Sequence, residues 1–320
     1  MNAKIRYRLD RNKRRVQRRL DKTKPYRGHG PVFSASNIHY EISDRVHGIS
    51  HGGIGAFHLL AQRLGLVDAI DRELHLLKIH MFYHESDHVL NFAYNALCNG
   101  DCLQDIELRR NDVNFLDALG AQRIPDPTTA GDFCRRFTPE TINILQDVYD
   151  EVRVGVWRQQ PDPFFERAIL DADGTLVPTD AEHKEGVDIA YDGTWGYHPL
   201  LVTLANTGEV MRLVNRSGNR PSHEGAADAL DRARATCLLA GFRKVLMRGD
   251  ADFSQTKHLD RWNDDGRVTF IFGYDARDNL KNIAEQLPET AWRTLERRGA
   301  PEPKTGTRQR VPNQIGRAHV

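Results

Sequence analysis

Residues 168 to 173 read Ala-Ile-Leu-Asp-Ala-Asp, and residues 244 to 250 read Lys-Val-Leu-Met-Arg-Gly-Asp. Each stretch begins with the apolar run of a buried strand and ends in an acidic residue. The final acids are Asp173 and Asp250. The sequence therefore predicts two strands that each carry an aspartate at their carboxyl end.

The segments around these two strands predict the rest of an α/β domain. Two strands, His198–Ala205 and Val210–Arg216, are expected to be joined by the turn Asn206-Thr207-Gly208. A helix capped by Ser222 and ended by Gly241 should follow them. After the second acidic strand we expect a helix from the cap Ser254 to Trp262 and a last strand, Val268–Phe272. The resulting order, β-β-β-α-β-α-β, is that of a ribonuclease H-like nuclease core.

In that topology the first and fourth strands are neighbours, which brings Asp173 and Asp250 together. Two adjacent carboxylates repel each other unless a cation lies between them, and hard oxygen ligands suit Mg²⁺, with Mn²⁺ as an alternative. Two such ions about 3.5–4 Å apart would support phosphodiester cleavage and strand transfer. Asp171 precedes Asp173 by two positions and faces the same way on a strand, so we predict it as a further metal residue. Strand-end aspartates also occur as turn residues and helix caps, and this reading stays open.

Residues 31–155 predict a helical region that precedes the core. Apolar residues recur at helical spacing around residues 59–74, 88–98 and 113–119, which predicts helices there. Thr128 or Thr129 is expected to cap a further helix with basic residues. Short helices of this kind bind DNA in some proteins and only pack in others. Prolines at 161 and 163 mark a linker. We therefore predict three parts: a basic N-terminal arm (1–30), a helical DNA-end-binding or assembly region (31–155) and the core (156–320).

The charge of the chain is concentrated at its N-terminus. Residues 1–30 hold twelve lysines and arginines but only two aspartates, whereas the whole 320-residue chain has a formal net charge of +1. A basic arm on an acidic body suits a polyanion, because each neutralised phosphate releases counterions. A solvated leader is the competing interpretation.

The composition predicts a folded protein outside the membrane. Hydrophobic residues make up 39% of the chain, enough for a sizeable core. No stretch reaches the roughly 20 apolar residues that a membrane span needs, and the basic N-terminus lacks the apolar run of a signal peptide. We therefore expect a cytoplasmic protein.

Several ordered motifs resemble one transposase family. They lie between about Asn37 and Pro312 and comprise residues 83–91 (Tyr-His-Glu-Ser-Asp-His-Val-Leu-Asn), 105–112, 125–133, 170–175 (Leu-Asp-Ala-Asp-Gly-Thr), 196–200, 218–222 (Gly-Asn-Arg-Pro-Ser) and 248–253 (Arg-Gly-Asp-Ala-Asp-Phe). The chain resembles the insertion-sequence transposases of the thirteen-eighty family, a branch of the DDE group related to the IS-four type.

The resemblance implies a Mg²⁺-dependent DNA transposase with three catalytic acids, which cleaves the ends of its element and joins them to new DNA. The Asp-Gly-Thr motif places the first acid at Asp173, and the Arg-Gly-Asp motif places the second at Asp250. The implied partners are the terminal inverted repeats, the target DNA and a homo-oligomer assembled on DNA. The helical region would contact element ends or a partner subunit.

The third acid, a glutamate on a later helix in the family, is not evident. Glu285, within the helical pattern from Leu280 to Leu287, is the best remaining candidate. Residues 315–320 depart from the family pattern and read like a translated junction, so we expect a core that is truncated at its C-terminus. A decayed natural element is the alternative. Two other functions remain open: a non-catalytic remnant that binds element DNA and inhibits transposition, and a nuclease that does not transpose.

Residues 84–88 read His-Glu-Ser-Asp-His and match the zinc-protease pattern H-E-x-x-H. That chemistry needs both histidines on one helical face and a third ligand. Ser86 or Asp87 is expected as a helix cap, which would leave His84 outside the helix. The sequence therefore disfavours a protease.

Overall fold

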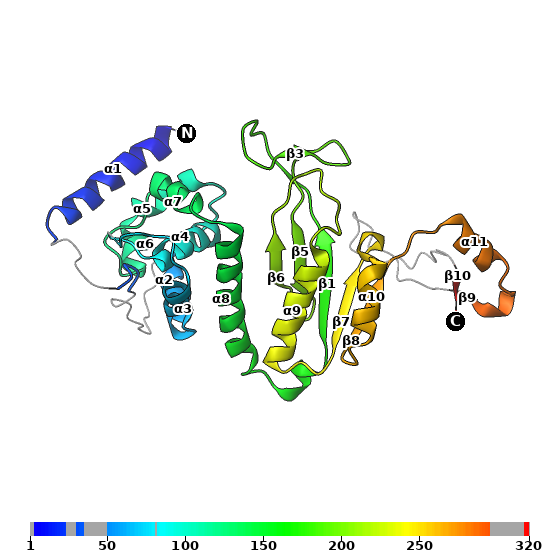
Figure 1. Ribbon diagram of the computed structural model, residues 1–320. Helices are drawn as coiled ribbons and strands as arrows, with labels where there is room; N and C mark the ends of the chain where they lie inside the picture. The colour runs from blue at the N-terminus through cyan, green and yellow to red at the C-terminus, as the bar shows by residue number, and fades with distance from the viewer. Residues whose placement is uncertain (1–2, 24–29, 35–49, 81, 295–316, 320) are drawn as a thin grey trace, which may run out of the picture.

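A computed structural model describes residues 3–23, 30–34, 50–80, 82–294 and 317–319. The N-terminal part is helical, as predicted (Figure 1). Its elements are α1 (Ala3–Leu20), α2 (Ile54–Arg63), α3 (Leu66–Glu73), α4 (Glu85–Leu97), η1 (Leu103–Asp105), α5 (Ile106–Arg110), α6 (Val113–Ala118), α7 (Pro127–Cys134) and α8 (Pro139–Trp157).

A five-stranded mixed sheet forms the centre of the second part, with the order β6-β5-β1-β7-β8. Its strands are β1 (Ala168–Gly174), β5 (Leu200–Leu204), β6 (Glu209–Val214), β7 (Val245–Gly249) and β8 (Val268–Phe272). β1 pairs in parallel with β7, β7 pairs in parallel with β8, and β5 and β6 are antiparallel. The predicted order of strands and helices is confirmed for this sheet, including the adjacency of its first and fourth strands.

Two helices cover one face of the sheet, α9 (Ala226–Ala240) and α10 (Thr256–Asn263) (Figure 1). Strand β1 alternates in burial, so that Leu170 and Ala172 point into the core while Asp171 and Asp173 lie on the opposite side. The packing of α9 thus fixes which face of β1 carries its acids.

A small three-stranded sheet between β1 and β5 was not predicted. It consists of β2 (Val177–Pro178), β3 (Asp188–Ile189) and β4 (Trp195–Tyr197), with β4 in the middle. In Figure 1 it lies beyond the carboxyl end of β1, which carries Asp173, and beyond the amino end of the antiparallel strand β5. Its strands have two or three residues, which is too short for a periodic signal in the sequence.

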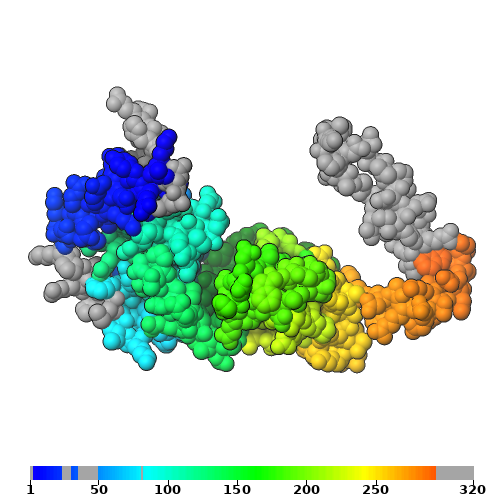
Figure 2. Space-filling model, turned by 90° about the horizontal axis from the view of Figure 1, so that it is seen from above, coloured from blue at the N-terminus to red at the C-terminus, as the bar shows by residue number. Residues whose placement is uncertain are grey.

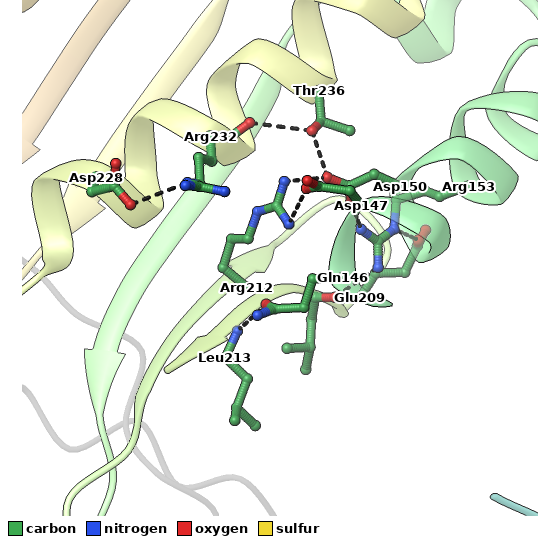
Figure 3. Close-up of polar contacts among 11 residues, drawn as sticks. Gln146, Asp147, Asp150, Arg153, Glu209, Arg212, Leu213, Asp228, Arg232 and Thr236 are labelled. Carbon is green, nitrogen blue, oxygen red and sulfur yellow. Dashed lines mark hydrogen bonds and ion pairs between the residues drawn. The ribbon is translucent and has the colours of Figure 1, made fainter. Parts of the chain in front are cut away.

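Helix α8 joins the helical part to the sheet through a buried polar cluster (Figure 3). Asp150 on α8 accepts hydrogen bonds from Arg212 on β6 at 2.5 Å and from the Thr236 hydroxyl on α9 at 2.7 Å, and it also pairs with Arg153. Burial raises the pKa of Asp150, and the hydrogen bond from Thr236 opposes that shift. Val154 and Trp157 then extend the helix into the core of the sheet.

Several predicted helix caps are wrong. Asp126, not Thr128 or Thr129, caps α7, because Pro127 occupies the first helical position and leaves the Asp126 carboxylate facing the free N–H groups. The cap of α9 is Gly225 rather than Ser222, and that of α10 is Gln255 rather than Ser254. Helix α9 starts three residues later and α10 one residue later than these caps implied, and neither helix has a side-chain cap.

The described part of the basic arm is a helix, which was not predicted. Helix α1 buries Leu9 and Val16 and lies along the outside of the helical region in Figure 2. Ion pairs from Lys13 to Glu107 at 2.8 Å and from Arg19 to Asp117 at 2.5 Å hold it there. Two basic residues of the arm, Lys24 and Arg27, lie outside the described residues.

The last elements extend away from the sheet on the side opposite the helical region (Figure 1). They are α11 (Asp278–Glu285), η4 (Glu289–Ala291), β9 (Trp292–Thr294) and β10 (Arg317–His319), with β9 paired to β10. Ile315, Gly316 and Val320 of the predicted junction, like Asn37 and Pro312, lie outside the described residues. In the part of the chain that the structure describes, no helix has the length and apolar character that crossing a membrane requires.

Candidate active site

The predicted acids lie at the carboxyl ends of β1 and β7. The two strands pair in parallel from Ala168 opposite Val245 to Asp171 opposite Arg248. Each residue of β7 is thus numbered 77 positions after its partner on β1. The same offset, continued past the end of β7, sets Asp173 opposite Asp250. Neighbouring strands are about 4.8 Å apart, so this register brings the two carboxylates to one place.

Asp173 and Asp250 line a common cavity of about 680 Å³. Both side chains are exposed. Within the described residues, the Asp173 carboxylate has no hydrogen-bond or ion-pair partner, and Asp250 accepts one bond through Oδ1 from the backbone N–H of Asp252 at 2.9 Å. Most carboxylate lone pairs in the cavity therefore remain available to a ligand.

The cavity also collects the motifs that are dispersed in the sequence. Its other lining residues come from the end of β1 and from the segments that follow β1, precede β5, follow β6 and follow β7: Gly174, Thr175, Leu176, Tyr191, His198, Gly218, Asn219, Arg220, Pro221, Ser222 and Asp252. Four of the motif stretches thus meet around the two aspartates.

Asp171 has a different environment from Asp173. Arg248 donates to both of its carboxylate oxygens, from Nε to Oδ1 at 2.6 Å and from Nη2 to Oδ2 at 2.7 Å. These hydrogen bonds raise the pKa of Arg248. Asp171 is not among the residues that line the cavity. Its predicted role as a metal residue stays a prediction.

The wall formed by residues 217–224 is organised by Arg216. This guanidinium is buried and donates from Nε to the His198 carbonyl and from Nη1 to the carbonyls of Pro221, Ser222 and Glu224, at 2.7–3.1 Å. Burial lowers the pKa of Arg216. Arg216 was not predicted as a site residue, because the sequence does not show that a basic residue at a strand end turns inward.

Two glycines permit the close approach of the cavity walls. A Cβ at Gly218 would lie 2.3 Å from the carbonyl oxygen of Asp188 and 2.7 Å from that of Gly196. A Cβ at Gly174 would lie 2.4 Å from Nε2 of His198. Glycine at these positions therefore lets the small sheet, the wall and β1 meet at the cavity.

The candidate third acid is placed elsewhere. Glu285 is exposed at the end of α11 and does not line the cavity. Across the described ranges, no three His, Cys, Asp or Glu side chains are grouped so that they would hold a metal ion by themselves.

The H-E-x-x-H stretch forms a packed helix start. His84 lies outside α4, as predicted, but it occupies the cap position itself, and Asp87 accepts from the backbone N–H of His84 at 2.9 Å. Asp87 also accepts from Val32 and Phe33, and His88 stacks on Phe133 with ring centroids 4.3 Å apart. The expectation that Ser86 or Asp87 is the cap is wrong.

The fold and the site together define an α/β domain that presents paired carboxylates at the ends of two parallel strands. Residues 44–312 match the family described as Transposase DDE domain group 1, and the chain belongs to this family of DDE transposases.

Comparison with curated proteins finds no match. Among solved structures, the chain is similar to one described as the cryo-EM structure of the piggyBac transposase synaptic complex with hairpin DNA. The two share 12% identity with a TM-score of 0.35, and the alignment covers 76% of this chain and 55% of that one. The chain thus spans about half the length of that transposase.

Proposed function

We propose that the protein is the transposase of an insertion sequence, of the thirteen-eighty lineage, with a ribonuclease H-like core. In this proposal Asp173 and Asp250 are two of its catalytic acids. The observation that carries the proposal is their placement at adjacent strand ends, over one cavity, in a chain of the DDE transposase family.

The cavity fits a hard divalent cation. Asp173 and Asp250 are exposed, carry like charges and keep lone pairs unused, which suits Mg²⁺ or Mn²⁺ with water in the remaining positions. A bound cation would activate the attacking hydroxyl and stabilise the leaving oxygen of a phosphodiester. The two aspartates hold the cation, while Asn219, Arg220 and Ser222 offer donors to phosphate oxygens from the facing wall. The backbone pairing of β1 with β7 sets the acids opposite each other, and the Asp171–Arg248 ion pair lies within that register.

Helix α1 and the helical region are the proposed contact with element ends. Arg6, Arg8, Arg11 and Arg15 have no partner within the described chain. Between α1 and the helical region lies a cavity of about 730 Å³ that is lined by further basic residues, among them Lys13, Arg14, Arg110 and Arg123. Such a surface suits the phosphates of duplex DNA, and we propose terminal inverted repeats and target DNA as partners, with a homo-oligomer assembled on them.

The alternative function is DNA binding without cleavage. It is favoured by the composition of the cavity, where the described residues supply aspartates but no glutamate. In that case the 320-residue chain binds element ends and inhibits an active transposase.

The test is Mg²⁺-dependent nicking of linear DNA that carries the element's terminal repeats. The proposal expects nicking at the repeat ends by the wild-type chain, its loss in Asp173→Asn and Asp250→Asn, and its persistence in Asp147→Asn, which changes an exposed aspartate on α8. Equal nicking by wild type and Asp173→Asn would refute the catalytic assignment. Specific binding of the repeat ends without any nicking would instead establish the alternative.

A further inference from the structure

Phe82 is a large aromatic side chain that the fold holds toward solvent. It lies three residues before the start of α4 and is 47% exposed. Its backbone φ is +78°, a left-handed conformation that bulky residues rarely adopt. Strained residues of this kind persist only where the surrounding structure holds them, and they concentrate at sites that bind ligands.

The neighbouring residues fix the position of Phe82. The Tyr83 hydroxyl donates to the carbonyl oxygen of Ile124 at 3.0 Å, and the Tyr83 ring packs edge-on against His88 with ring centroids 5.7 Å apart. The hydrogen bond ties the chain before α4 to the loop between α6 and α7. Tyr83 packs against the helical core, and Phe82 is left outside it, beside Arg123.

The Phe82 ring carries a guanidinium on one of its faces. The Cζ atom of Arg123 lies 3.7 Å from the centroid of the Phe82 ring. Arg123 forms no ion pair within the described residues, so its N–H groups stay available to an anion. Because the guanidinium covers one face of Phe82, the exposed area belongs mainly to the other face and the edge of the ring.

Arg123 also connects this stack to the basic cavity beside α1. That cavity, of about 730 Å³, is lined by four basic residues and two acidic ones: Lys13, Arg14, Arg110, Arg123, Asp21 and Glu107. Lys13 and Arg110 neutralise Glu107, at 2.8 and 3.3 Å. A basic groove beside an exposed aromatic ring suits a nucleic acid strand, whose phosphates bind in the groove while a base stacks on the ring.

We propose that Phe82 and Arg123 form a stacking site for one unpaired base of the DNA bound along α1. The open face of the Phe82 ring takes the base, and Arg123 takes a neighbouring phosphate. The base has to be unpaired, because the neighbouring bases of a duplex cover both faces of a stacked base. This inference rests on the proposed DNA contact of the helical region, and it adds a preference for DNA that is locally single-stranded.

The test compares two DNA probes on the full 320-residue chain. One is a blunt duplex of mixed sequence, and the other is the same duplex with a single-stranded extension of either polarity that carries a fluorescent base analogue. Wild type should bind the extended probe more tightly and quench the analogue.

The variant Phe82→Gly removes the ring. Glycine adopts the left-handed backbone without strain, so we expect a melting temperature close to that of wild type. The variant should bind the extended probe about 5- to 150-fold more weakly, lose the quenching, and bind the blunt probe like wild type.

A second variant, Phe82→Leu, keeps the apolar bulk without an aromatic face and should show the same loss if the glycine variant is unstable. The control Phe57→Ala removes a side chain of α2 that is 52% exposed and lies outside the cavity, and it should bind both probes like wild type. Wild-type quenching by a folded Phe82 variant, or an equal loss of affinity for both probes, would overturn the stacking site alone. A wild-type chain that binds neither probe would instead overturn the proposed DNA contact.

Discussion

Arg248 on β7 binds both carboxylate oxygens of Asp171 on β1, at 2.6 and 2.7 Å, across the centre of the sheet. The two residues are direct neighbours in the parallel register. Two positions further along each strand, the same register sets Asp173 opposite Asp250, with no cation of the described chain between them. One acid of β1 is thus neutralised by the protein, and the next is left for a ligand.

Asp171→Asn tests whether Asp171 itself holds the metal. Both partners of its ion pair are partly exposed, at 43% for Arg248 and 37% for Asp171, so we expect a loss of at most about 1 kcal/mol in the free energy of unfolding. We also expect Mn²⁺ affinity to stay within about three-fold of wild type. An affinity loss as large as that of Asp173→Asn would show that Asp171 is a ligand.

Divalent cations should stabilise the wild-type fold through the acid pair. At a cation concentration 100 times the dissociation constant, binding adds about 2.7 kcal/mol to the free energy of unfolding. Asp173→Asn should lose this effect and, without cation, should melt at or above the wild-type temperature, because a repulsion between carboxylates is removed. Thermal melts with and without Mg²⁺ measure both quantities. A cation-induced shift that persists in Asp173→Asn would contradict the assignment.

Asp150→Asn should destabilise the protein strongly. The change leaves the Arg212 guanidinium, 6% exposed, beside a neutral amide, and breaking a buried pair typically costs about 3–5 kcal/mol. Urea unfolding gives the value. The control is Asp147→Asn, which removes a 59% exposed partner of the same arginine and should cost about 1 kcal/mol or less. Similar costs for both variants would show that the buried cluster does not couple α8 to the sheet.

Gly218→Ala should damage both stability and the cavity. The new Cβ meets two backbone carbonyl oxygens, which cannot move aside as a side chain would, and we expect a loss of about 1–3 kcal/mol together with weaker Mn²⁺ binding. Gly155→Ala in α8 meets nothing within 4 Å and should instead stabilise the helix by about 0.5–1 kcal/mol. A neutral Gly218→Ala would mean that the wall and the small sheet are not tightly packed.

His88 should make stability depend on pH. Burial lowers the pKa of His88 to about 4, from an ordinary value near 6.5. As the pH falls from 6.5 to 4, the unfolded chain takes up a proton that the folded protein refuses, so stability falls by about 3 kcal/mol from this group. The neighbouring Asp87, whose pKa burial raises to about 6, acts in the opposite direction.

The variant His88→Phe isolates the histidine, because Asp87 is still present in it. Chemical unfolding at several pH values should show that the stability difference between wild type and variant changes by about 3 kcal/mol between pH 6.5 and 4. A difference that stays constant with pH would mean that folded His88 titrates normally.

The sequence predicted the sheet well because its strands have strong local signals. The apolar runs of β1, β7 and β8 are long enough to recognise, and the turn at residues 206–208 marks the β5–β6 hairpin. The adjacency of β1 and β7 followed from the order of elements. The positions of Asp173 and Asp250 at strand ends were predictable for the same reason, while their catalytic role stays a prediction.

What the sequence did not predict depends on tertiary contacts. Helix α1 has two buried residues among many charges, and its packing against Glu107 and Asp117 is not visible locally. The orientation of the His198 ring depends on a carbonyl 22 positions away, at Arg220. The motif at residues 196–200 was the available signal, but a lone histidine before a strand does not reveal what its ring contacts.

The hydrogen bonds from Arg216 to the cavity wall all go to backbone carbonyl oxygens. Every residue type has the same carbonyl, so this support does not depend on which residues the wall carries. Asn219, Arg220 and Ser222 can therefore be exchanged while the shape of the loop is kept. The scaffold and its chemical surface are therefore separable here: the side chains that face the cavity can change while the path of the loop stays the same.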